Sequence, residues 1–192
     1  MHTLIEPDNL YNTVCRAADL LFQGNSLIET NVDALVAFIL ANTHPYKGFL
    51  FFTTPAIRAS GIRLVTGEKP RTLLLANNAV ELETLRLLAL LRPHQSAVRQ
   101  VLDQANLRLE KQCFASVCLL GECAAASIVY LRYLTALGVE AHRAQIAHGL
   151  ASLVQDRSDN GKWRHFPTRF TRRWLLELPR ELSAAELEYS HP

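Results

Sequence analysis

The sequence predicts an α+β fold, because patterns typical of helices and patterns typical of strands both occur along the chain. In the N-terminal half, apolar residues recur at helical spacing over 8–23 and 30–42. In the C-terminal half, a nearly all-apolar stretch at 124–137 indicates a buried helix, and strand-like runs follow it. The chain has 192 residues, of which 49% are hydrophobic, and this is enough for one compact core.

The N-terminal half is predicted to contain four helices and a β-hairpin. The helix at 8–23 stops at Gly24, and the helix at 30–42 begins with a capping-box-like Thr30. A short buried strand at 49–54 and a hairpin at 62–76 follow. The hairpin pairs 62–66 with 71–76 around a Gly-Glu-Lys-Pro turn. Two further helices are expected at 78–91 and 95–111.

The C-terminal half is predicted to pack its apolar helix, 124–137, against a three-stranded antiparallel sheet. The strands are expected at 140–147, 149–156 and 162–170, with an Asn-Gly turn before the third. Two short helices are expected at the end of the chain, around 171–177 and 183–189.

Composition excludes several classes of protein. The 20 basic and 18 acidic residues give a formal charge of +2, which argues against a dedicated nucleic-acid binder. No uncharged apolar run reaches the roughly 18 residues of a membrane span. The N-terminal residues lack the basic start and apolar run of a signal peptide, so we expect a cytoplasmic protein with no membrane association.

The most informative residue is Cys123, which stands at the start of the apolar helix. The positive end of a helix dipole stabilises a thiolate, and free backbone N–H groups can stabilise an oxyanion. His148 opens the second predicted strand, and a sheet packed on the helix would bring its imidazole to the sulfur. A Cys–His pair of this kind attacks carbonyl carbon. Cys123 and His148 are therefore the predicted catalytic pair.

This part of the chain resembles the transglutaminase-like superfamily of cysteine enzymes over about residues 121–170. The matching residues are Gly121, Cys123, Leu137, Gly138, Val139, Ala141, His148, Gly161, Lys162, Trp163, Pro167 and Thr168. The resemblance implies a papain-like core and acyl chemistry through a thioester, which would cleave or form an amide or thioester bond. The substrate would be a peptide, an amine or an acyl carrier, and no cofactor would be needed.

The sequence does not identify the third catalytic residue, which would orient the histidine. Phe166 stands where the family has the acid that orients the histidine, and His165 is its nearest polar neighbour. We assign Gly121, Glu122 and Trp163 to substrate binding.

Together these predictions describe a single domain over 1–192 with two parts. Residues 1–112 form the mostly helical subdomain that carries the hairpin. Residues 113–192 hold the Cys–His catalytic core and the C-terminal helices.

Other interpretations of the same residues stay open. The missing acid favours an inactive transglutaminase-like binding module. The seven Lys and Arg residues of 157–180 could instead dock an anionic partner. Cys118 is a candidate resolving thiol or a core residue, whereas Cys113 and Cys15 are most simply packing residues. We expect no metal site, because Cys118, Cys123 and His148 lack the close ligand spacing that structural zinc prefers.

Overall fold

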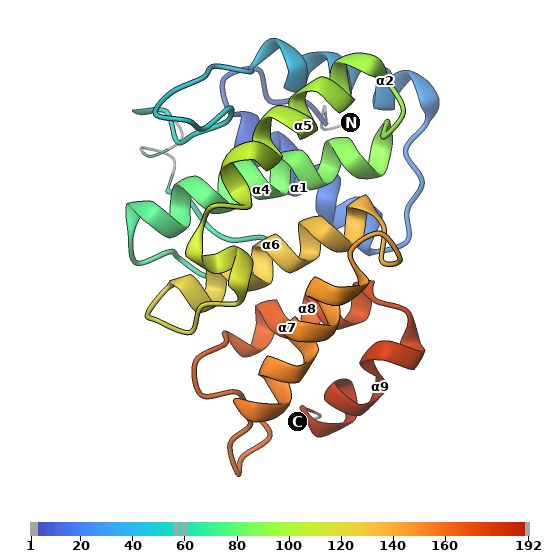
Figure 1. Ribbon diagram of the computed structural model, residues 1–192. Helices are drawn as coiled ribbons and strands as arrows, with labels where there is room; N and C mark the ends of the chain where they lie inside the picture. Colours follow the sequence, from blue (N-terminus) through green and yellow to red (C-terminus); the bar gives the residue numbers. More distant parts are fainter. Residues whose placement is uncertain (1–3, 56–57, 59–60, 191–192) are drawn as a thin grey trace. The chain divides into compact units, whose positions relative to one another are not determined.

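The protein is all-helical (Figure 1). The computed structural model describes residues 4–55, 58 and 61–190, and no sheet occurs in this part of the chain. The only strand-like pairings in these residues are two isolated bridges, Tyr46 with Phe49 and Arg157 with Trp163. The predicted α+β fold is therefore wrong. The sheet that was expected to carry His148 does not form, and neither does the helix-on-sheet core that the resemblance implies.

The chain divides into two compact units, with the division between Arg108 and Leu109. The helices of the first unit are α1 (Leu10–Phe22), α2 (Glu29–Ala41), α4 (Leu73–Leu91) and α5 (Ser96–Leu109), the last of which ends at the division. The second unit contains the 3-10 helix η1 (Cys113–Ser116), α6 (Cys123–Leu137), α7 (Arg143–Gln155), α8 (Thr168–Glu177) and α9 (Arg180–Tyr189).

The first unit is organised around α4, on which both α1 and α2 pack. Its buried polar centre is Glu81, which is fully buried on α4. Glu81 accepts a hydrogen bond from the backbone N–H of Leu50 at 2.7 Å and forms an ion pair with Arg108 of α5. The Arg108 guanidinium also lies 4.1 Å from the ring centre of Phe49. These contacts join the 49–50 segment, predicted as part of a strand, to two helices outside any sheet.

The predicted hairpin at 62–76 is also wrong, because its second half is the start of α4. Thr72 caps this helix by accepting a hydrogen bond from the backbone N–H of Leu75 at 3.3 Å. The residues that follow are mainly Leu and Ala, which are strong helix formers. The turn itself exists, since Leu64 donates to the carbonyl of Glu68 at 2.7 Å, but no ladder extends from it.

The second unit is organised around α6, which packs against η1, α7 and α8. Arg132 of α6 is fully buried and forms an ion pair with Glu177 of α8 at 2.7 Å. The indole N–H of Trp174 donates to the hydroxyl of Thr135 at 3.0 Å. The apolar helix predicted at 124–137 is confirmed, and its all-round apolar character is satisfied by helices rather than by a sheet.

The predicted strands at 140–147 and 149–156 form a single helix, α7. Its buried residues Ile146, Gly149 and Leu153 recur with helical periodicity. Gly149 serves close helix packing, because a Cβ atom there would lie 2.6 Å from Leu131. The third predicted strand, 162–170, is a loop as far as Pro167, and its last three residues belong to α8.

The two helices expected near the C-terminus are confirmed as α8 and α9, although each begins three residues early. A proline, which favours the start of a helix and not its interior, directly precedes each one. Among the described residues, no helix has both the length and the apolar composition that are needed to cross a bilayer.

Candidate metal centre

Three cysteines of the second unit come together at the start of α6. Cys113 is the first residue of η1, Cys118 lies in the loop that follows, and Cys123 is the first residue of α6. Their Sγ atoms all lie within 4.8 Å of one another, and those of Cys113 and Cys123 are 3.4 Å apart. Cys113 is exposed and the other two are half-buried. The cluster thus borders solvent on one side.

Two left-handed residues turn the chain so that the three thiols converge. Val117 ends η1 with a φ of 55°, and Gly121 has a φ of 53°. A left-handed conformation is common for glycine but is strained for a β-branched residue such as valine. Strain of this kind costs of order 1–3 kcal/mol and tends to occur at functional sites.

Side chains of α6 hold this loop in place. The hydroxyl of Ser127 donates to the carbonyl of Cys123 at 2.9 Å and lies 3.3 Å from the carbonyl of Cys118. The ring of Phe114 on η1 packs on Tyr130, with ring centres 5.7 Å apart. The segment that carries the thiols is therefore anchored to α6 through Ser127 and Tyr130.

The electrostatics of the cluster oppose ionisation of Cys123. Burial, followed by the neighbouring sulfurs of Cys113 and Cys118, raises the pKa of Cys123 to about 12. The position at a helix N-terminus was expected to lower this pKa. Burial and the neighbouring thiols together outweigh the helix dipole, so Cys123 carries its proton at neutral pH in the metal-free protein.

Cys123 and His148 lie on different helices, α6 and α7. His148 is exposed on α7, and its neighbour Gly149 faces Leu131 of α6. Leu131 lies two helical turns beyond Cys123, about 12 Å along the axis. No hydrogen bond or ion pair links the His148 imidazole to Cys123 in the described residues, and their catalytic pairing stays a prediction from sequence.

His165, the weak candidate for the third catalytic role, is paired with a carboxylate. Its Nδ1 lies 2.6 Å from Oδ1 of Asp156, and its backbone N–H donates to Oδ2 of the same residue at 2.8 Å. The Asp156 side chain is 3% exposed, whereas that of His165 is 52% exposed. Asp156 thus orients an accessible imidazole, a pairing that sequence reasoning missed because it placed residue 156 at the end of a strand.

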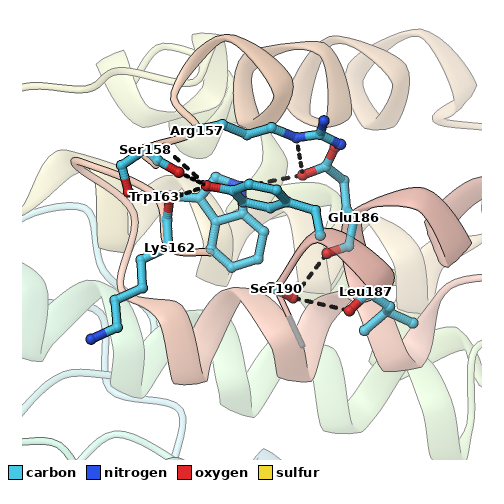
Figure 2. Close-up of polar contacts among 8 residues, drawn as sticks. Arg157, Ser158, Lys162, Trp163, Glu186, Leu187 and Ser190 are labelled. Carbon is cyan, nitrogen blue, oxygen red and sulfur yellow. Dashed lines mark hydrogen bonds and ion pairs between the residues drawn. The ribbon is translucent and has the colours of Figure 1, made fainter. Parts of the chain in front are cut away.

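The predicted substrate-binding residues lie in two different settings. Gly121 is exposed and Glu122 half-buried, and both belong to the segment that leads into Cys123. Trp163 is 4% exposed, and its indole N–H donates to Glu186 of α9 at 3.2 Å. Figure 2 shows Glu186 between Trp163 and the guanidinium of Arg157, with which it also forms an ion pair. Contact between Trp163 and a substrate would require this network to open.

Several arginine side chains of the basic segment 157–180 form contacts within the second unit. Arg157 pairs with Glu186, Arg164 donates to the carbonyl of Arg157 at 3.0 Å, and Arg172 donates to the hydroxyl of Ser190 at 2.9 Å. Arg173 is buried. These contacts account for much of the positive charge that suggested an anionic partner.

Sequence reasoning missed the thiol cluster because it treated Cys113 as a packing residue. The available signal was the regular spacing, with five residues from Cys113 to Cys118 and five more to Cys123. This spacing matches neither a helical face nor a Cys-x-x-Cys motif, and it becomes a site only because Val117 and Gly121 turn the chain.

The cluster fits a tetrahedral zinc ion. Zinc binds thiolate sulfur at about 2.3 Å, and tetrahedral geometry then separates neighbouring sulfurs by about 3.8 Å. The cluster has one separation of 3.4 Å and none above 4.8 Å, so small side-chain movements would bring all three thiolates to one ion.

Comparison with models of protein families, with curated proteins and with solved structures gives no match to this chain.

Proposed function

We propose that this chain is a metal-binding helical protein in which Cys113, Cys118 and Cys123 hold a zinc ion. The observation that carries the proposal is the mutual approach of three sulfur atoms within 4.8 Å. Neutral thiols attract one another only weakly, whereas a thiophilic cation attracts all three as thiolates. An ion would also offset the mutual repulsion that disfavours ionisation in the metal-free cluster.

The three thiolates would supply three of the four positions of tetrahedral zinc. The exposed edge at Cys113 gives water access to the fourth position. The bound ion would join η1, the loop and the first turn of α6, three segments that carry one ligand each. Its role would be to fix the start of the central helix of the second unit.

The test is to load the reduced, metal-free full chain with Co²⁺, which replaces Zn²⁺ in tetrahedral sites and reports on its ligands. We expect a thiolate-to-cobalt charge-transfer band in the near ultraviolet that saturates at about one ion per chain. Addition of Zn²⁺ should abolish the band. A full chain that binds no ion in this assay would overturn the proposal.

Single serine variants locate the site. Cys113→Ser, Cys118→Ser and Cys123→Ser should each weaken binding at least tenfold, since a hydroxyl is a poor ligand for zinc. Cys15→Ser is the matched control, because Cys15 is also half-buried but lies on α1. It should bind cobalt like the unchanged chain. Far-ultraviolet circular dichroism of each variant shows whether the helices are retained.

A further inference from the structure

The same cluster contains a pair of thiols that is placed to form a disulfide. We infer that the zinc site proposed above is controlled by oxidation, in which a small-molecule disulfide links Cys113 to Cys123 and displaces the ion. This inference rests on the proposed metal function for its consequence, but the disulfide itself can be tested on the metal-free chain.

The first argument is the approach of the two sulfurs. The Sγ atoms of Cys113 and Cys123 are 3.4 Å apart, whereas a disulfide requires about 2.0 Å. The difference of about 1.4 Å is within the range of rotamer and loop adjustment. Because Cys113 belongs to a single 3-10 turn, it can move without unwinding a longer helix.

The second argument is the difference in exposure. Cys113 is exposed, whereas Cys118 and Cys123 are half-buried. An oxidant from solvent therefore reaches Cys113 first, and the nearby sulfur of Cys123 resolves the product. Leu120, which is 79% exposed, lies in the loop between the two half-buried thiols, so this loop itself borders solvent.

The reaction balances with a disulfide as the oxidant. The Cys113 thiolate attacks one sulfur of oxidised glutathione, forming a mixed disulfide and releasing one glutathione thiolate. The Cys123 thiolate, which is freed from zinc or forms by loss of a proton to solvent in the metal-free chain, then attacks the adjacent Cys113 sulfur and releases the second glutathione as a thiolate. The two protein thiols lose two electrons, and the glutathione disulfide gains them.

The consequence for the metal follows from ligand count. A Cys113–Cys123 disulfide removes two of the three thiolates and leaves only Cys118. A single thiolate is too few ligands to retain zinc, so the ion is released. A disulfide at an exposed site is of the labile, regulatory kind, and reduction would restore the site.

The experiment treats the zinc-loaded full chain with oxidised glutathione and follows two products. A chromogenic chelator reports released zinc, and peptide mass mapping without reduction identifies the disulfide. We expect release of about one zinc for each Cys113–Cys123 link formed, and recovery of binding after reduction. A link that maps mainly to Cys118, or glutathione retained on Cys113, would overturn the inference.

Variants separate this inference from the metal proposal. Cys118→Ser should lose tight metal binding yet still form the Cys113–Cys123 link in the metal-free chain. Cys113→Ser should form no link to Cys123, and Cys15→Ser should behave like the unchanged chain in both assays. If the chain binds no metal but forms the link, only the metal proposal fails. If it binds metal and forms no link, only the redox inference fails.

Discussion

Cys123 shows how neighbouring groups decide the chemistry of one residue. Its place at the start of α6 favours a thiolate, but burial and two adjacent sulfurs raise its pKa to about 12. A thiol with such a pKa is a weak nucleophile at neutral pH. The same sulfur becomes a good ligand once a cation compensates the negative charge, since metal binding and deprotonation are coupled.

This coupling predicts that metal binding depends on pH. Zinc must displace the proton of Cys123, so its apparent affinity should rise steadily between about pH 6 and pH 8. The raised pKa of Cys123 fixes the direction of this change. The thiol remains protonated throughout this pH range, so lowering the pH increases the competition of protons with zinc for the sulfur. Isothermal titration in buffers of different ionisation enthalpy would measure the protons released. Affinity that stays constant with pH would contradict the prediction.

Glu186 illustrates a buried carboxylate with a structural role. It is 3% exposed, accepts a hydrogen bond from Trp163 and pairs with Arg157, as Figure 2 shows. Removing it leaves both donors without this acceptor. The network joins the loop after α7 to α9 and so holds the C-terminal helix of the second unit.

We therefore expect Glu186→Ala to destabilise the protein by about 1–3 kcal/mol, the usual cost of leaving buried donors unsatisfied. Urea denaturation followed by circular dichroism measures this loss. Glu188→Ala is the control, because Glu188 is exposed on the same helix and its removal should change stability by less than about 0.5 kcal/mol. Equal effects from the two variants would show that the network does not stabilise the fold.

At the scale of elements, α7 shows what sequence patterns leave undetermined. The sequence on either side of His148 was interpreted as two strand-like runs, 140–147 and 149–156. The observed helix uses Gly149 to approach α6 closely. That requirement comes from the packing partner and is invisible in a local window, so the periodicity of Ile146, Gly149 and Leu153 gave the better indication.

The direction in which Gly149→Ala changes the stability of the protein tests this explanation. Helix propensity alone predicts that alanine stabilises the helix by about 1 kcal/mol. The structure predicts the reverse, because the new methyl group would lie 2.6 Å from Leu131 and 3.1 Å from Trp174. Overpacking of this kind costs about 1–3 kcal/mol. A thermal or urea unfolding curve shifted towards greater stability would refute the close approach of α7 to α6.

Elements with strong local signals were predicted well. The helix expected at 8–23 is observed at Leu10–Phe22, and the one expected at 95–111 at Ser96–Leu109. Both have an apolar periodicity that local sequence fully expresses. The start of α4 was missed because its Leu-rich first turn resembles a buried strand, and only the cap at Thr72 separates the two interpretations.

The candidate site was only partly predictable for a related reason. The position of Cys123 at a helix start follows from local sequence. Its partner Cys113 was missed, because their meeting depends on the left-handed turns at Val117 and Gly121. A non-glycine residue such as Val117 rarely adopts that conformation, so no sequence pattern predicts the turn at Val117. The His148 pairing was expected from the resemblance and from a sheet that does not form.

At the scale of the whole molecule, each of the two units has its own central helix, α4 in the first and α6 in the second. All three proposed metal ligands belong to the second unit. A ligand that binds only the folded state stabilises it by mass action. The stabilisation by zinc should therefore be largest in the segments that carry the three thiols.

Amide hydrogen exchange with and without zinc would locate this effect. With free zinc at a hundred times its dissociation constant, linkage adds about 2.7 kcal/mol to openings that release the ion. Amides of η1, the 117–122 loop and the first turns of α6 should then exchange up to about a hundredfold more slowly. Helices α1 and α2, which carry none of the ligands, serve as the internal reference. Slowing that is equal in α1, α2 and α6, or absent from α6, would show that the ion does not bind at the three cysteines.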